Sequence, residues 1–432
     1  MMRYTFSKER FLKELHKCPK VDGVNPYELA EKLAAVNSVG RTKEEGYLRY
    51  PYTDEEKRVK QLFTQWLEEL GLHVWEDAVG NLFARWEGED SSAPVVMTGS
   101  HIDTVPNGGA FDGTLGCVSS LLAIKGLQNK GVRPKRSIEF VIFTNEEGTR
   151  FGYGLFGSKV LMGEVLPEQL HHFVDEKGIS MYEAMKQCGF DPEKIPQSKR
   201  DPNSIYAFLE LHIEQGKQLE ETGDKIGIVT GIAGPAWRNF TFLGETDHAG
   251  NTPMTMRKDS LAGAAEWIVE VEKLPKQYSS TAVATVGRIQ AFPNGTNVIA
   301  GKTVVDVDVR DIEKEARDQL LKAITESAKQ IAEKRDLELV IRNGIEVDPV
   351  PIPVSLQQTI AKAAERHKIP FMYLPSGAGH DAMNIGKYTK AAIIFVPSHA
   401  GKSHCPEEWT SLPDCMYGVQ ILMDTIWEVA NE

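Results

Sequence analysis

Long apolar runs are absent from this 432-residue sequence. No segment approaches the roughly eighteen consecutive apolar residues that a membrane-spanning helix needs. The first twenty residues, MMRYTFSKERFLKELHKCPK, also lack the apolar centre of a secretory signal. We therefore expect no membrane partner and a cytoplasmic location.

The sequence also contains few cysteines and no excess of positive charge. The five cysteines, Cys18, Cys117, Cys188, Cys405 and Cys415, include no CxxC pair, so neither a disulfide framework nor a thiolate zinc site is expected. The formal net charge is -12. Because phosphate binding depends on clustered Lys and Arg, no nucleic-acid partner is expected.

The composition is that of an ordinary globular protein, with 41% hydrophobic and 25% charged residues. A chain of this length exceeds what one hydrophobic core usually supports, which predicts two domains. Apolar residues at helical spacing predict a helix from Thr53 to Gly71, and alternation on both sides of Asp77–Asn81 predicts a hairpin. Residues 93–148 then read as strand, helix and strand, a pattern that favours a parallel or mixed sheet.

The pattern changes after about residue 232. From there the sequence predicts strand, helix, two strands, helix and strand, a βαββαβ order large enough for a separate α+β domain. We expect a two-domain α/β fold, with a mixed-sheet domain built from residues 1–232 and 346–432 and an inserted domain at 233–345.

Histidines and acidic residues lie where the predicted strands end. His101, Glu146 and Glu147 follow buried apolar segments, and α/β folds place their sites at such ends. Two adjacent acids near a cleft require a neutralising cation. The chemistry of these side chains does not decide which of Glu146 and Glu147 would bind a metal and which would act as a base. Imidazole and carboxylate groups suit zinc, manganese, cobalt or nickel, and the candidate ligands are His101, Asp112, Glu147, His212 and His404.

Six segments in order carry a family resemblance: GSHIDTVPNGGAFDGTLG, TNEEGTRF, ELHIEQG, ETDHAGNTPM, SGAGHDAM and IFVPSHAGKSHCPEEW. Together they resemble the M20-type dimetal peptidase and amidohydrolase superfamily. Within it they are similar to the branch of N-carbamoyl-L-amino-acid hydrolases, allantoate amidohydrolases and β-ureidopropionases. The resemblance implies a dimetal catalytic domain and an inserted lid and dimerisation domain, with two divalent metal ions in each subunit of a homodimer.

The resemblance also implies a metal-binding role for each candidate ligand. His101 and His212 would bind one metal, Glu147 and His404 would bind the other, and Asp112 would bridge both.

Two further acids would assist the reaction. Glu146 would be the general base that takes a proton from the attacking water and returns it to the leaving nitrogen. Asp103 would orient His101 through its second ring nitrogen, although an Asp that only caps its loop is an alternative.

A second set of residues would bind the substrate in relatives of this kind. His248 and Asn297 would stabilise the oxyanion, and Arg310 would bind a substrate carboxylate. Asn297 has the alternative of a turn residue, and Arg310 has the alternative of an ion pair with Asp306, Asp308 or Asp311. Gln215, Gly377, Ala378 and Gly379 complete the predicted substrate contacts, while His380 and Asp381 would line the cleft or support the ligands.

The resemblance predicts a metal-dependent hydrolase of a linear amide or ureido bond. The expected partner is a small ureido or carbamoyl acid. The favoured substrate is an N-carbamoyl-L-amino acid, hydrolysed to ammonia, carbon dioxide and the free L-amino acid. Allantoate hydrolysis is the main alternative, because only a few pocket contacts distinguish the two substrates. Peptide or N-acyl-amino-acid hydrolysis and a non-catalytic binding protein are weaker alternatives.

Overall fold

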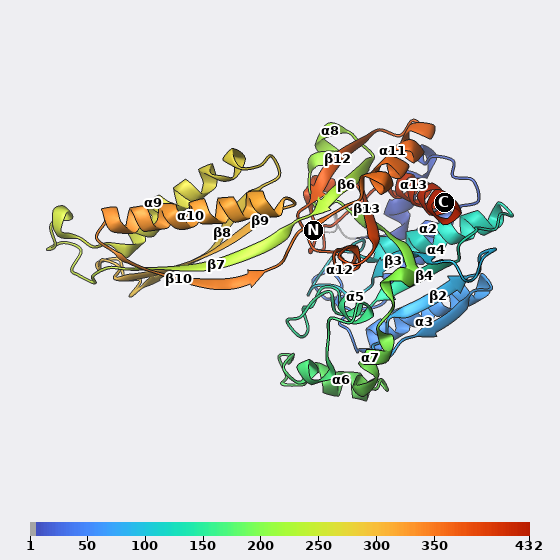
Figure 1. Ribbon diagram of the computed structural model, residues 1–432, viewed down its shortest axis with the longest axis horizontal. Coiled ribbons are helices and arrows are strands. Elements are labelled where there is room, and N and C mark those ends of the chain that lie inside the picture. The colour runs from blue at the N-terminus through green and yellow to red at the C-terminus, as the bar shows by residue number, and fades with distance from the viewer. Residues whose placement is uncertain (1–5) are drawn as a thin grey trace. The chain divides into compact units, whose positions relative to one another are not determined.

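The computed structural model describes residues 6–432 and divides them into two compact units (Figure 1). The first unit contains the chain up to Thr230 together with Ile352–Leu374 and His380–Glu432. The second contains Gly231–Pro351 and Pro375–Gly379. The segment 233–345, which the sequence suggested as an inserted domain, falls within this second unit.

A nine-stranded mixed sheet has the strand order β1-β2-β4-β3-β5-β13-β6-β11, with β12 paired to β6. Strands β4, β3, β5 and β13 run parallel, whereas β1, β2, β6 and β11 pair antiparallel with their neighbours. The expected mixed sheet is therefore confirmed. Its strands are β1 (His73–Glu76), β2 (Leu82–Trp86), β3 (Val95–His101), β4 (Ile138–Phe143), β5 (Ile205–Ile213), β6 (Ile226–Ile232), β11 (Val350–Pro351), β12 (Phe371–Ser376) and β13 (Lys390–Val396).

Helices of the first unit pack on both faces of its sheet. Side chains alternate between faces along a strand. Leu211 lies against Gly418 of one helix, whereas Glu210 accepts a hydrogen bond from the N–H of Ala382 in another. The helices of this unit are α1 (Lys8–Leu12), α2 (Pro26–Val36), α3 (Asp54–Glu69), α4 (Thr114–Asn129), α5 (Phe156–Leu161), α6 (Met181–Gln187), α7 (Ile195–Ser198), α8 (Gln218–Thr222), α11 (Val354–Arg366), α12 (Asp381–Gly386) and α13 (Leu412–Asn431).

The first part of the chain forms the elements that its local sequence predicts. Thr53 precedes α3, and its hydroxyl accepts the N–H of Glu56, which satisfies one of the free donors at the helix start. Strands β1 and β2 pair antiparallel around the turn at Asp77–Asn81, so the expected hairpin is confirmed. Helix α4 is buried along almost its whole length, because the sheet and other helices surround it.

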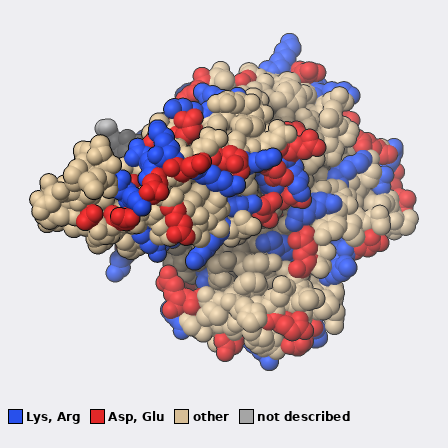
Figure 2. All heavy atoms as spheres, turned by 60° about the vertical axis from the view of Figure 1, so that its left-hand side comes forward, with Lys and Arg blue, Asp and Glu red and all other residues tan. Residues whose placement is uncertain are grey.

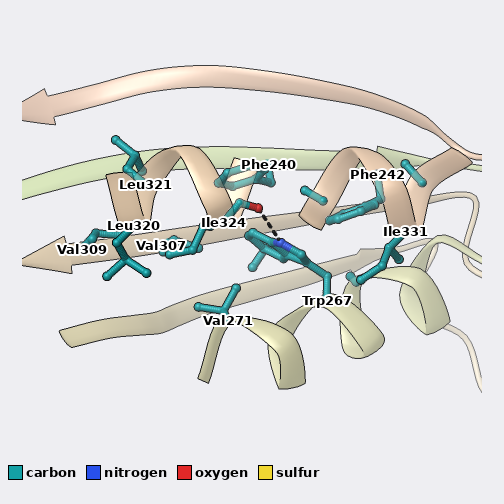
Figure 3. Packing of buried hydrophobic residues seen from close by; sticks show 14 of the residues in the cluster. Phe240, Phe242, Trp267, Val271, Val307, Val309, Leu320, Leu321, Ile324 and Ile331 are labelled. Carbon is teal, nitrogen blue, oxygen red and sulfur yellow. Dashed lines mark hydrogen bonds between the residues drawn. The ribbon is translucent and has the colours of Figure 1, made fainter. Parts of the chain in front are cut away.

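The second unit contains a four-stranded antiparallel sheet with the order β10-β7-β9-β8. Two helices pack on this sheet around Trp267, whose Nε1–H donates to the carbonyl of Ile324 at 3.1 Å (Figure 3). The predicted βαββαβ order is confirmed by β7 (Gly234–Leu243), α9 (Ser260–Lys273), β8 (Val283–Phe292), β9 (Lys302–Asp311), α10 (Lys314–Lys334) and β10 (Glu338–Glu346).

Charged side chains of both signs are interspersed on the face that Figure 2 shows. Within residues 6–432, no helix combines the length and the apolar character that crossing a membrane requires.

Candidate metal centre

The candidate ligands of the first unit lie at the carboxyl ends of parallel strands. His101 is the last residue of β3, and His212 is the last but one of β5. Glu147 follows β4, and His404 lies in the segment after β13. Because neighbouring parallel strands end at the same edge of a sheet, the fold gathers residues that are far apart in the sequence.

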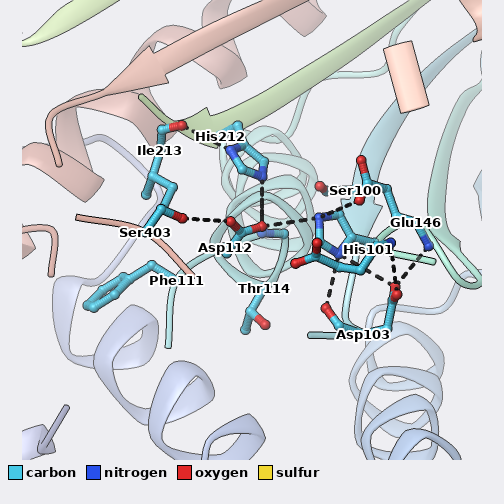
Figure 4. A network of polar contacts seen from close by, with 12 residues as sticks. Ser100, His101, Asp103, Phe111, Asp112, Thr114, Glu146, His212, Ile213 and Ser403 are labelled. Atoms are coloured by element: carbon cyan, nitrogen blue, oxygen red, sulfur yellow. Dashed lines mark hydrogen bonds and ion pairs between the residues drawn. The ribbon is translucent and has the colours of Figure 1, made fainter. Parts of the chain in front are cut away.

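One donor group consists of His101, Asp112 and His212, and all three residues are buried. The Nε2 atoms of His101 and His212 each lie 3.3 Å from Oδ1 of Asp112 (Figure 4). The three donor atoms lie within 4.8 Å of one another. Two imidazoles and a carboxylate at this spacing are a donor set that suits zinc or a similar divalent ion.

A second donor group uses the other oxygen of the same carboxylate. Nε2 of His404 lies 3.3 Å from Oδ2 of Asp112 and 3.6 Å from Oε2 of Glu147. Asp112 therefore faces one group with each of its oxygens, which is the arrangement of a bridging ligand. These two groups are the candidate dimetal site, and both contain Asp112.

Hydrogen bonds from the second ring nitrogens orient the two buried histidines. Nδ1 of His212 lies 2.9 Å from the carbonyl of Ile213, and Nδ1 of His101 lies 3.1 Å from the carbonyl of Asp103. Because a carbonyl only accepts, Nδ1 is the donor in each contact, so the neutral ring that binds a metal would carry its lone pair on Nε2, on the side of Asp112. The residues therefore fit a metal ion in tautomer as well as in donor type.

The electrostatics of the centre also fit a cation. Burial raises the pKa of Glu146 well above its usual range, and the charge of Glu147 adds to this effect. Burial together with the charge of Asp112 raises the pKa of Glu147 to about 8. Burial alone would lower the pKa of His101, but the neighbouring carboxylates, Glu146 foremost, raise it. Divalent ions would satisfy the negative charge that these buried acids concentrate.

The carboxylate of Asp103 fixes the segment that contains both glutamates. Its two oxygens accept the backbone N–H groups of Glu146 and Glu147 at 3.1 and 3.0 Å. The carboxylate of Asp103 also lies 3.5 Å from Nδ1 of His101. The backbone carbonyl of Asp103 is closer to the same nitrogen, at 3.1 Å. Asp103 thus contacts His101 and also ties the end of β3 to the end of β4.

Glu146 belongs to neither donor group. Its Oε2 nevertheless lies 3.8 Å from Nε2 of His101, so the carboxylate stands beside the centre with its oxygens outside the ligand set. A free carboxylate at this place can accept and return a proton. The geometry thus favours Glu147 as ligand and Glu146 as base, an assignment that remains a prediction.

Gln215 lies against the shared carboxylate. Its Nε2 donates to Oδ2 of Asp112 at 2.7 Å and lies 3.3 Å from Nε2 of His404. The residue has a φ of 57°, a left-handed conformation that is uncommon outside glycine. Its predicted role as a substrate contact stays a prediction.

In the second unit, backbone hydrogen bonds set the ring orientation of His248. The N–H groups of Gly250 and Asn251 both donate to its Nδ1 at 3.1 Å. Nδ1 is therefore the acceptor and Nε2 carries the proton of the neutral ring. The N–H of Ala249 donates to the carbonyl of Asn297 at 3.0 Å, so the two predicted oxyanion contacts lie on adjacent backbone segments.

Arg310 makes the ion pair that the sequence left as an alternative. Its guanidinium contacts both oxygens of Asp308, at 2.8 to 3.1 Å. Nη1 also donates to the carbonyl of Gly377 at 2.7 Å, which joins Arg310 to the Gly377–Gly379 segment. Arginine has five N–H donors, so these contacts leave donors for a carboxylate.

Sequence reasoning did not assign a role to Ser403 and Glu408, although both lie in the last motif. The hydroxyl of Ser403 lies 2.9 Å from Oδ2 of Asp112, and Glu408 is buried beside it. His380, expected to line the cleft, is buried with its ring edge-on to His212 at 4.6 Å between centroids. Only the fold distinguishes these residues from surface polar residues.

Comparison with known proteins agrees with this geometry. Residues 97–428 match the peptidase family M20/M25/M40, and the chain belongs to this family. Within it the chain falls in the hydantoinase/carbamoylase branch of amidohydrolases. The expected enzyme class, a hydrolase of carbon–nitrogen bonds other than peptide bonds, is confirmed.

The chain is 42% identical to an N-carbamoyl-L-amino acid amidohydrolase from Geobacillus stearothermophilus over 403 residues, which cover 93% of this chain and 98% of the relative. It is 35% identical to an allantoate amidohydrolase from Escherichia coli over 402 residues, 93% of this chain and 97% of that one. A crystal structure of an amidase of the hydantoinase/carbamoylase family from Burkholderia multivorans superposes with a TM-score of 0.91 and 33% identity, covering 96% and 100% of the two chains.

Proposed function

We propose that this protein hydrolyses N-carbamoyl-L-amino acids. One water and one N-carbamoyl acid yield the free L-amino acid, ammonia and carbon dioxide. The observation that carries the proposal is a pair of donor groups that share Asp112. Glu146 is buried beside them and belongs to neither group, so its carboxylate can act as a base. Among the relatives reported above, the 42% identical protein bears the name of this activity.

The residues of the centre have complementary tasks in this reaction. His101, Asp112 and His212 would hold one divalent ion, and Asp112, Glu147 and His404 would hold the second. When bound, two such ions would supply Lewis acidity toward the amide oxygen and would lower the pKa of the attacking water. Glu146 accepts the proton of the attacking water and delivers it to the leaving nitrogen.

Residues of the second unit would bind the rest of the substrate. His248 offers an Nε2–H donor, because its Nδ1 accepts two backbone N–H groups, and such a donor stabilises a developing oxyanion. Arg310 offers a planar fork that suits the substrate α-carboxylate. Asn297, Gln215 and Gly377–Gly379 are proposed as further substrate contacts.

A homodimer through the second unit is part of the proposal. Strand β8 forms one end of the four-stranded sheet, and Val283, Ile289 and Phe292 along it are 45 to 51% exposed. An exposed apolar edge strand offers unpaired backbone groups to a second copy. Light scattering of the purified protein should give twice the 48.1 kDa chain mass, and a monomer would contradict this part.

The deciding experiment is ammonia release from a substrate panel. Metal-free protein is reloaded with zinc, manganese, cobalt or nickel and assayed on several N-carbamoyl-L-amino acids, N-carbamoyl-β-alanine and allantoate. Release from the carbamoyl amino acids alone supports the proposal. Preference for allantoate would establish the second candidate, which the 35% identical allantoate amidohydrolase supports. No release from any of them with two metals bound would refute both.

A further inference from the structure

Glu408 is a buried carboxylate beside the candidate metal centre, but it belongs to neither donor group among the described residues. It lies four residues after His404 in the segment between β13 and α13. The residue is 1% exposed. Burying a carboxylate is costly unless several hydrogen-bond donors surround it, so the donors around Glu408 indicate what it does.

Those donors belong to the segment that carries the bridging ligand. Oε1 of Glu408 accepts the backbone N–H of Phe111 at 2.7 Å and that of Asp112 at 3.0 Å. These contacts join residues 297 and 296 positions apart in the chain. Because two N–H groups converge on one oxygen, the main chain of Asp112 is held in a single orientation.

The second oxygen reaches the same ligand by another route. Oε2 of Glu408 lies 3.0 Å from the hydroxyl of Ser403, and that hydroxyl lies 2.9 Å from Oδ2 of Asp112. Ser403 directly precedes His404, a ligand of the second donor group with a φ of 57°. Glu408 therefore contacts the segments that carry Asp112 and His404 at the same time.

The packing around Glu408 leaves little freedom for its side chain. A Cβ atom added to Gly109 would lie 2.1 Å from both Cδ and Oε1 of Glu408. Contacts this short do not occur, so only glycine at position 109 lets the carboxylate occupy this place. Gly109, just before the Asp112 segment, is thus required here for a steric reason.

We propose that Glu408 is a positioning residue that aligns Asp112 and His404 into one preformed metal site. The donor group of Asp112, Glu147 and His404 draws its ligands from three separate segments, and Glu408 joins two of them. Groups that orient metal ligands commonly change metal affinity 10–100-fold when removed. The inference rests on the proposed function, because it requires the two metal ions.

The test compares zinc binding, measured by competition with a chromophoric chelator, in four variants. Glu408→Ala removes both connections. Glu408→Gln keeps a carbonyl oxygen for the two N–H groups and an amide that can donate to Ser403. Ser403→Ala removes the hydroxyl between Oε2 of Glu408 and Oδ2 of Asp112, together with its contact to Gln215, but keeps the two backbone N–H contacts of Glu408. Glu407→Gln is the matched control, because Glu407 lies next in sequence and its side chain contacts Cys405 and Lys402, neither of which belongs to a donor group.

The expected result is a loss of about 10–100-fold in affinity for one of two zinc ions in Glu408→Ala. The loss should be smaller in Ser403→Ala and smallest in Glu408→Gln, with no change in Glu407→Gln. At limiting zinc, kcat should fall while KM stays constant, and excess zinc should restore kcat. A merely structural residue would lower the melting temperature of the metal-free protein without this rescue.

Wild-type zinc affinity at both sites in folded Glu408→Ala would overturn the inference. If that variant does not fold, Ser403→Ala decides, and unchanged affinity there overturns the inference equally. A wild-type protein that binds fewer than two zinc ions would instead refute the proposed function, so the two failures are distinguishable.

Discussion

At the scale of single residues, Glu146 and Glu147 are neighbours with different tasks. Glu147 contributes an oxygen to the second donor group, whereas Glu146 belongs to neither group. We predict that Glu146→Gln lowers kcat by about 10²–10⁴-fold, because the variant loses the proton acceptor but keeps the shape. Metal content, measured by atomic absorption, should stay at the wild-type value.

Glu147→Gln is the matched comparison for that experiment. It removes a ligand, so one metal should be lost along with activity. Near-normal turnover in Glu146→Gln would show that another group accepts the proton.

Arg310 has a separable effect on substrate binding. Its Nε and Nη2 both contact the carboxylate of Asp308, which restrains the guanidinium. We predict that Arg310→Ala raises KM for a carbamoyl amino acid roughly 10–100-fold, in line with the loss of one charged hydrogen-bonded contact. Steady-state kinetics measure this change, with Arg288→Ala of the same sheet as control, because Arg288 is 61% exposed. An unchanged KM in Arg310→Ala would remove Arg310 from the substrate site.

At the scale of elements, Asp103 connects the ends of β3 and β4. Its carboxylate accepts the backbone N–H groups of Glu146 and Glu147. In Asp103→Asn, one of these N–H groups would face an NH₂ instead of an oxygen. We predict a loss of about 10-fold or more in metal affinity, measured by chelator competition. Equal affinity in Asp103→Asn and the wild type would reduce Asp103 to the loop-capping residue that the sequence also allowed.

Elements with a strong repeating pattern were predictable from the sequence. Helix α3 has its apolar residues at helical spacing, and β9 alternates buried and partly exposed residues along VVDVDVRD. Residues 151–200 were not predicted, because α5, α6 and α7 have four to seven residues each, too few for a period to emerge. These short helices nevertheless share a hydrophobic cluster that also contains Tyr52, Val79, Phe151 and Leu170.

In the candidate metal centre, the sequence predicted only those residues whose type and motif suggest metal binding or proton transfer. His101, Asp112 and Glu147 were named from their motifs, and the fold brings them together as donors. Glu407 and Glu408 look alike in the sequence, but the fold buries the second and leaves the first half-buried. Supporting residues of this kind depend on contacts almost 300 positions apart, which no local pattern encodes.

At the scale of the whole molecule, metal binding should determine much of the stability. Ions that bind only the folded state stabilise it by RT ln(1 + [L]/Kd), about 4 kcal/mol at a thousandfold excess over Kd. We predict that chelation lowers the melting temperature by several degrees and that zinc or manganese restores it. Calorimetry with and without chelator measures this, and magnesium is a control, because it favours all-oxygen sites. Equal melting temperatures would contradict the presence of a bound metal.

The stabilisation by metal should also increase with pH. Without metal, the pKa of Glu147 is raised from 4.5 to about 8 in the folded chain. Between these values the unfolded chain binds fewer protons than the folded chain, so this group lowers the stability of the metal-free protein as pH rises. Ligands must be deprotonated to bind metal, so affinity also increases with pH. The gain in melting temperature on adding zinc should therefore be larger at pH 8 than at pH 6. The reverse order in the wild type, or the same pH dependence in Glu147→Gln, would show that other groups control the coupling.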